Sequence, residues 1–219
     1  MKTAVIGMGR IGTTVATLLA GGGQEVVVAD RKPDKAVALA AKLGGSVTSA
    51  DIEDAIRTTD VVVPTIIFAA LPEFVSAYAE QLAGKILIDP TNPVSFDERG
   101  PIARLVGDNE SGGQVLAAQL PGSIAYAKAF GTLGADTLTD AADARPRAVL
   151  FYVTDDDTAA SAVEELVTAA GYTPVRAGGI DRAADIELQG ALHQYGGLGR
   201  TVTAAEAAEL VRRRHFTPN

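Results

Sequence analysis

The sequence predicts an α/β fold, a doubly wound parallel sheet of the Rossmann type with a small C-terminal α/β portion. Short β-branched runs alternate with helical patterns through the first half of the chain, as in βαβ units. A glycine-rich turn joins the first run to the first helical pattern, and the second run ends in an acidic residue. We expect a Rossmann domain over residues 1–140 and a smaller portion over residues 141–219 that completes a substrate cleft.

The elements of the first half follow from apolar runs and from apolar residues spaced three and four apart. We expect strands near 3–7, 25–30, 46–49, 60–65 and 85–88, and helices near 10–21, 33–43, 51–57 and 68–82. Pro33 suits a first helical turn, Gly44-Gly45 ends that helix, and Asp51 can cap the next one.

The second half has weaker signals. Residues 97–113 are polar and glycine-rich, which predicts an exposed connection, while residues 114–120 fit a helix or a strand equally well. An apolar stretch over 123–130 and a polar linker over 140–146 follow. We then expect a strand at 148–153, a helix capped by Asp155-Asp156-Asp157 and ending near 170, a strand at 173–177, and helical segments at 181–194 and 204–214.

The glycine-rich turn is Gly7-Met8-Gly9-Arg10-Ile11-Gly12. Gly7 permits a tight strand-to-helix turn, Gly9 lets the backbone approach a pyrophosphate, and Gly12 lets the helix pack on the strand. The free N–H groups of the helix then hold the phosphates. An ordinary glycine turn of another α/β protein is the alternative, but the preceding strand, the following helix and Asp30 all favour a dinucleotide site.

The loops after the fourth and fifth strands are expected to line the nicotinamide half of the cleft. In an open α/β sheet the ligand lies beyond the carboxyl ends of the strands, where Thr65-Ile66-Ile67 and Pro90-Thr91-Asn92-Pro93 stand. The second loop could also be a simple proline-bounded turn.

Composition narrows the classes of function. The chain of 219 residues is 47% hydrophobic, which allows a substantial core, and its formal charge of −8 argues against a general nucleic-acid surface. It has no cysteine, and His193 and His215 lie far apart, so no metal site is expected. The first strand begins at Thr3 and no apolar run could span a bilayer, so we expect a cytoplasmic protein without a membrane partner.

Six motifs follow one another in an order that resembles a known family: Gly7-Met8-Gly9-Arg10-Ile11-Gly12, Asp30-Arg31-Lys32 with Lys35-Ala36, Asp60-Val61-Val62-Val63, Ile88-Asp89-Pro90-Thr91-Asn92-Pro93, Ala127-Lys128-Ala129-Phe130 and Ala177-Gly178-Gly179. This order is similar to that of the NADPH-dependent reductases of the deazaflavin coenzyme F420, which also resemble the N-terminal domain of pyrroline-5-carboxylate reductases. The resemblance covers nearly the whole chain and is strongest before residue 132.

The resemblance implies an NADP-dependent oxidoreductase, commonly a homodimer, that passes hydride directly between NADP(H) and coenzyme F420. It implies that the pyrophosphate is held by Gly7, Gly9, Arg10, Ile11 and Gly12, and that Arg31 and Lys35 approach an adenosine 2′-phosphate. It further implies that Ile66 and Thr91-Asn92-Pro93 flank the nicotinamide, and that Lys128 and Phe130 border the second substrate.

The chain departs from the family pattern at two places. Asp30 stands where members that select NADPH usually carry a hydroxyl or an Asn, and a carboxylate there favours the free ribose of NAD. Arg31 and Lys32 favour a 2′-phosphate, so we expect NADP, with NAD as the alternative. The second departure is Gln194-Tyr195-Gly196-Gly197-Leu198-Gly199, which interrupts the terminal helix that the family uses beside the deazaflavin.

Lys128 and His193 are the candidate catalytic residues. Lys128 could donate a proton or bind an anionic substrate, or it could simply extend from an apolar stretch to water. His193 could act as an acid or be a structural histidine. Two alternatives to F420 therefore stay open: reduction of a small carbonyl or imine substrate, with one of these residues supplying a proton, and a nucleotide-sensing protein without chemistry.

Overall fold

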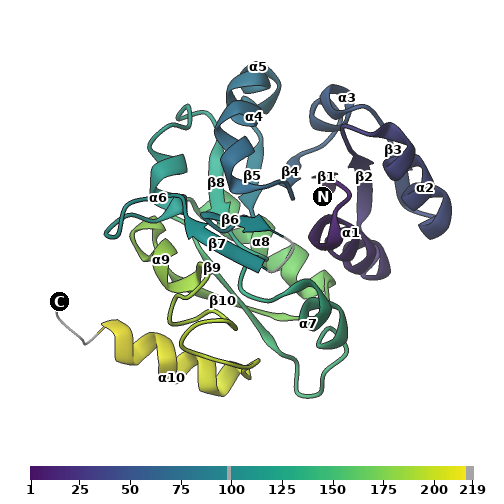
Figure 1. Cartoon of the computed structure of the whole chain (residues 1–219). Coiled ribbons are helices and arrows are strands. Elements are labelled where there is room, and N and C mark those ends of the chain that lie inside the picture. The colour runs from purple at the N-terminus through teal and green to yellow at the C-terminus, as the bar shows by residue number, and fades with distance from the viewer. Residues whose placement is uncertain (98–99, 216–219) are drawn as a thin grey trace.

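An eight-stranded sheet runs through the whole protein in the computed structural model, which describes residues 1–97 and 100–215. The strand order is β10-β9-β8-β5-β4-β1-β2-β3 (Figure 1). The strands are β1 (Lys2–Ile6), β2 (Glu25–Ala29), β3 (Val47–Ser49), β4 (Val61–Pro64), β5 (Ile86–Asp89), β8 (Ala125–Lys128), β9 (Val149–Val153) and β10 (Thr173–Gly178). Neighbouring strands are parallel except β8 and β9, which pair antiparallel.

This order confirms the predicted doubly wound α/β fold. After β3 the chain crosses to the other side of β1 and continues with β4, so the direction of winding reverses between β1 and β4. Ligands of such sheets bind at the carboxyl ends of the strands beside that reversal. Strands β9 and β10 extend the same sheet, and α10 (Ala204–His215) lies beside β10 at the far side from the first three strands (Figure 1).

Helices cover both faces of the sheet because alternate strand residues point to opposite sides. Val5, Val28 and Ile88 belong to one core with α1 (Arg10–Gly21), α2 (Pro33–Leu43), α7 (Ala135–Asp140) and α8 (Asp157–Ala169). Ile6, Val27 and Leu87 belong to a second core with α3 (Ile52–Arg57), α4 (Leu71–Ala77), α5 (Ala79–Leu82), α6 (Gly112–Ala117), α9 (Ala183–Ile186) and α10.

The elements expected in the first half are confirmed apart from one helix, and so are two caps. Asp51 accepts a hydrogen bond from the Asp54 N–H at 2.8 Å, and Asp156 accepts one from the Ala159 N–H at 2.8 Å. The single helix expected over 68–82 is wrong: a 3₁₀ turn η1 (Phe68–Ala70), α4 and α5 replace it. Pro72 lies in the first turn of α4, where a helix tolerates proline, and Tyr78 leaves helical geometry at φ −116° and ψ 24°.

The second half departs further from the expected elements. A hairpin of β6 (Val94–Asp97) and β7 (Gly100–Arg104) begins before the connection expected over 97–113 and extends into it; the hairpin crosses in front of the central strands (Figure 1). Residues 98–99 lie outside the described part. Residues 114–120 begin in helix α6, the stretch 123–130 contains β8, and α7 precedes the linker over 140–146.

The helix expected over 181–194 is also wrong. A 3₁₀ turn η2 (Ile180–Arg182) and α9 end at Ile186, because Glu187 turns to extended backbone and Gln189 adopts a left-handed φ of +70°. The strand at 148–153, the helix after it and the last helix are confirmed. No helix within 1–97 and 100–215 is long and apolar enough to cross a membrane.

Candidate functional site

The glycine loop needs glycine at two places for steric reasons. Gly7 has φ +99°, and its N–H donates to the Ala29 carbonyl at 2.7 Å. A Cβ on Gly12 would lie 1.9 Å from the Gly7 carbonyl oxygen, so only glycine lets α1 pack this closely on the end of β1. The first and third glycines of the motif therefore have the geometry that the sequence predicted for them.

Gly9 differs from the other two because it faces open space. It is the N-cap of α1, no side chain caps the helix there, and a Cβ on Gly9 would meet no atom within 4 Å. The first turn of α1 also contains no acidic residue. Uncapped N–H groups together with the positive end of the helix dipole suit an anion. A hollow of about 480 Å³ opens at this place, lined by Met8, Gly9, Arg10, Thr13, Thr14, Ala135 and Asp136.

Thr65 joins the loop after β4 to the glycine loop. Its hydroxyl lies 3.0 Å from the Ile6 carbonyl oxygen and 2.6 Å from that of Gly7. The Ile66 side chain would contact a Cβ on Gly7 at 3.2 Å, and Ile67 is 64% exposed at the start of η1. The structure thus brings this loop beside the glycine loop, at the reversal between β1 and β4.

Asp30 is held by the backbone on both of its oxygens. Oδ2 accepts from the Met8 N–H at 2.6 Å and Oδ1 accepts from the Lys32 N–H at 2.8 Å. Burial opposes ionisation of Asp30, but these two donors, with Lys35 and Arg31 nearby, outweigh it and lower the pKa of the carboxyl. The carboxylate therefore ties the glycine loop to the end of β2.

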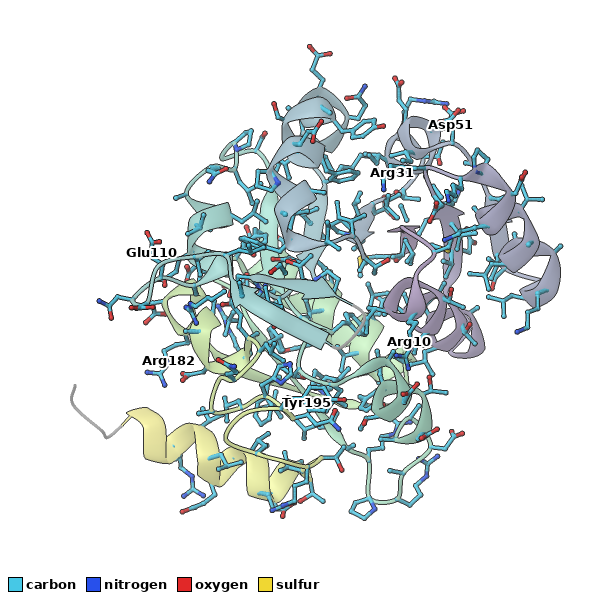
Figure 2. All side chains as sticks on the ribbon, in the orientation of Figure 1. Arg10, Arg31, Asp51, Glu110, Arg182 and Tyr195 are labelled. Atoms are coloured by element: carbon cyan, nitrogen blue, oxygen red, sulfur yellow. The ribbon has the colours of Figure 1, made fainter. Side chains whose placement is uncertain are left out.

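The basic residues after Asp30 remain available to a ligand. Arg31, Lys32 and Lys35 are exposed, and among the described residues their side chains make no hydrogen bond or ion pair. Figure 2 labels Arg31 on the part of the molecule that carries the first three strands. The structure thus gathers exposed cations at the carboxyl end of β2, next to the glycine loop.

The loop after β5 is fixed from both sides. The Thr91 N–H donates to Asp89 at 2.7 Å, and the Thr91 carbonyl accepts from Lys128 Nζ at 2.6 Å. Asn92 Nδ2 donates to the Gly131 carbonyl at 3.1 Å, while Asn92 Oδ1 accepts from the Leu188 N–H at 2.6 Å. Pro93 is buried beside them. A rigid wall therefore stands at the carboxyl end of β5.

Lys128 lies in a buried ionic cluster. Its Nζ is 3.0 Å from Asp89 Oδ2 and 3.6 Å from Glu187 Oε1, and all three side chains are at most 3% exposed. Glu187 accepts the N–H groups of Gly112 and Gly113 at the start of α6, at 3.1 and 2.9 Å. The Tyr126 hydroxyl donates to Asp89 at 2.9 Å, and burial with this carboxylate raises the pKa of the Tyr126 phenol.

His193 is buried with both ring nitrogens engaged by backbone. Nδ1 accepts from the Tyr195 N–H at 2.9 Å, so the ring proton is on Nε2, which donates to the Gly131 carbonyl at 2.9 Å. Burial lowers the pKa of the imidazole to about 4, against the opposing effect of the Gly131 bond. The imidazole is therefore neutral near pH 7.

Phe130, which the resemblance places beside the second substrate, is fully buried in this structure. Its side chain is 0% exposed and belongs to the core beneath β8, and its backbone has a left-handed φ of +64°. The chain here turns sharply after β8, so that the Gly131 carbonyl meets both Asn92 and His193.

Sequence reasoning missed Asp136, Thr13, Thr14, Asp89 and Glu187. Asp89 ends a strand beside Lys128 in the sheet register, a signal that a correct pairing of β5 with β8 would have revealed. Asp136 lies 126 residues from its partner Arg10 in the sequence, and Glu187 lies 75 and 74 residues from Gly112 and Gly113. No local sequence pattern points to such contacts.

Comparison with known proteins agrees with this geometry. Residues 2–93 match the family described as NADP oxidoreductase coenzyme F420-dependent. The metalloreductase STEAP3 of Rattus norvegicus is 30% identical over 186 residues, which cover 85% of this chain but only 36% of that protein. The F420-dependent NADP reductase of Methanothermobacter thermautotrophicus is 29% identical over 197 residues, covering 85% of each.

Solved structures give the same result. A hypothetical protein of Sinorhizobium meliloti superposes with a TM-score of 0.79 at 23% identity, covering 93% of this chain and 95% of its own, which shows the fold. A structure from Arthrobacter, provisionally named as an F420-dependent NADP reductase, has a TM-score of 0.69 at 28% identity, covering 84% and 87%. These findings confirm the expected family resemblance and an NAD(P)-linked oxidoreductase.

Proposed function

We propose that the protein transfers hydride between NADP(H) and coenzyme F420, because residues 2–93 match the family described as NADP oxidoreductase coenzyme F420-dependent. The observation that carries the proposal is the uncapped, open start of α1 beside a group of exposed cations. A relative of nearly equal length, the F420-dependent NADP reductase at 29% identity, supports the same acceptor.

In this proposal the pyrophosphate and the nicotinamide bind at separate parts of the chain. The N–H groups at Gly9, Arg10 and Ile11 bind the pyrophosphate, where Gly9 leaves room for its approach. The Thr65–Ile67 and Thr91–Pro93 loops flank the nicotinamide at the carboxyl ends of β4 and β5. When bound, the nicotinamide supplies or accepts the hydride, and a proton from solvent balances reduction of the deazaflavin.

The proposed preference for NADP over NAD rests on the hydrogen bonds that the Asp30 carboxylate already accepts from the backbone. Both of its oxygens already accept backbone N–H groups, so the carboxylate has less capacity to bind a free ribose diol. Arg31 and Lys35 are exposed and free to pair with a 2′-phosphate, and a charge-assisted bond of this kind contributes about 1.5–3 kcal/mol. We therefore assign the 2′-phosphate to these two side chains.

Lys128 and His193 act as positioning residues in this proposal. Lys128 holds the Thr91 carbonyl from a buried cluster, and His193 holds the Gly131 carbonyl through its single ring proton. In the described part of the chain, the polar hydrogens of both side chains point to protein acceptors and not to the cleft. Direct hydride transfer needs no acid or base from the chain, so positioning of the two rings supplies most of the rate.

The experiment titrates the protein with NADPH, NADH and oxidised F420 and follows loss of the deazaflavin absorbance. Turnover with NADPH supports the proposal; turnover only with a small carbonyl or imine, or binding without hydride loss, would replace it with one of the alternatives. Arg31→Ala should lower the NADP-to-NAD affinity ratio by about tenfold or more. Lys42→Ala, at the other end of α2, is the matched control and should leave the ratio unchanged.

A further inference from the structure

The hollow at the start of α1 has a wall that the dinucleotide motif does not provide. Met8, Gly9 and Arg10 form one side, and α7 forms the other through Ala135 and Asp136. Asp136 thus places a carboxylate in the same hollow that would hold the two phosphates of a dinucleotide. Sites for anions ordinarily contain no carboxylate, because like charges repel.

Asp136 is directly paired with the arginine of the glycine motif. Arg10 Nη2 lies 2.5 Å from Asp136 Oδ1, and the two side chains are 74% and 83% exposed. The hydrogen bond and the charge of Asp136 raise the pKa of the Arg10 guanidinium. Figure 2 labels Arg10 and Tyr195 in the region where Figure 1 labels α7.

The start of α7 is held in place, so Asp136 stays near Arg10. The Gly134 N–H donates to Gln194 Oε1 at 3.0 Å, and Gln194 Nε2 donates to the Thr137 hydroxyl at 2.8 Å. A Cβ on Gly134 would lie 2.4 Å from the Tyr195 hydroxyl, so the Tyr195 side chain rests against this turn. An exposed ion pair of this kind adds little to the stability of the fold.

We propose that Asp136 competes with the cofactor's pyrophosphate for Arg10 and thereby lowers the affinity for NADP(H), an inference that rests on the proposed function. Arg10 has to leave Asp136, or share its donors, before it can pair with a phosphate oxygen. The carboxylate also repels the phosphates directly. The site therefore binds NADP(H) more weakly than the same glycine loop and helix would without Asp136, and the weaker binding favours release of the dinucleotide.

The test is calorimetric titration of the purified full chain with NADP⁺ and with NADPH. Asp136→Asn keeps the size of the side chain and removes its charge, and it should tighten binding of both redox forms by about two- to fivefold. Asp140→Asn removes the same charge from the other end of α7, outside the hollow, and should leave the affinity unchanged.

A second pair of variants separates competition from plain repulsion. Arg10→Ala should weaken binding, and in that background Asp136→Asn should give a clearly smaller gain, because there is no guanidinium left to compete for. An equal gain in both backgrounds overturns the competition. Unchanged or weaker binding by Asp136→Asn overturns the whole inference while the proposed function stands, whereas a wild-type chain that binds no NADP(H) overturns both.

Discussion

Removing the ammonium group of the buried Lys128 is expected to destabilise the fold, because it is the positive charge that pairs with two buried carboxylates. Lys128→Met keeps the apolar stem of the side chain and deletes the ammonium group, which faces Asp89 and Glu187 (0% and 2% exposed) and donates to the Thr91 carbonyl. Breaking a buried ion pair by removing one partner costs about 3–5 kcal/mol.

The structure places the expected loss at the lower end of that range. Asp89 keeps its bonds from Thr91 and Tyr126, and Glu187 keeps those from Gly112 and Gly113. We therefore expect the free energy of unfolding to fall by about 3 kcal/mol, a large part of the total of about 5–15 kcal/mol. The midpoint of thermal unfolding should fall by about 6–12 °C.

The assay is urea unfolding followed by far-ultraviolet circular dichroism, with Lys42→Met as the exposed control. The control should change the free energy of unfolding by no more than about 0.5 kcal/mol. Adding Asp89→Asn to Lys128→Met should recover part of the loss, because one stranded charge is removed. A loss below about 1 kcal/mol for Lys128→Met would refute the reasoning, since it would mean that the cluster is not an ionic one shielded from water.

Two further predictions follow from the site. Because the pKa of His193 is about 4 in the folded chain and near 6.5 when unfolded, the unfolded state binds more protons between these values, so lowering the pH from 6.5 to 4 should cost about 3 kcal/mol of stability. His193→Gln should remove that part of the pH dependence, and an unchanged slope of unfolding free energy against pH would contradict the buried neutral imidazole. Gly12→Ala should prevent close packing of α1 and lower the thermal midpoint, since its Cβ would lie 1.9 Å from the Gly7 carbonyl oxygen. An alanine variant as stable as wild type would show that the helix can shift away.

Local patterns were enough to predict the glycine loop and the position of Asp30 beside it. Gly7 and Gly12 are required by the geometry of one turn, and Asp30 follows from the length of one βαβ unit, so short-range sequence signals determine them. The strands β4 and β5 are apolar on both faces, which located the loops at Thr65 and Thr91.

The remainder depended on contacts that no local pattern encodes. The apolar spacing over 181–194 predicts a helix, but Glu187 leaves the helix and binds the N–H groups of Gly112 and Gly113. Tertiary hydrogen bonds thus overrode helical propensity. Asp136 entered the hollow only because α7 packs beside α1, and its sequence neighbours gave no sign of that placement.

The most direct test of the central claim, that the open start of α1 binds the pyrophosphate of NADP(H), is titration of Gly9→Ala with NADPH. A Cβ on Gly9 meets no atom of the chain within 4 Å, so this variant should fold, with only the small loss of stability that alanine causes at an N-cap. If the account is correct, it binds NADPH at least about tenfold more weakly, because the added methyl group stands where the phosphates are proposed to approach. Gly21→Ala, an equally open glycine at the end of the same helix, should bind like wild type. Wild-type affinity in Gly9→Ala would contradict the account.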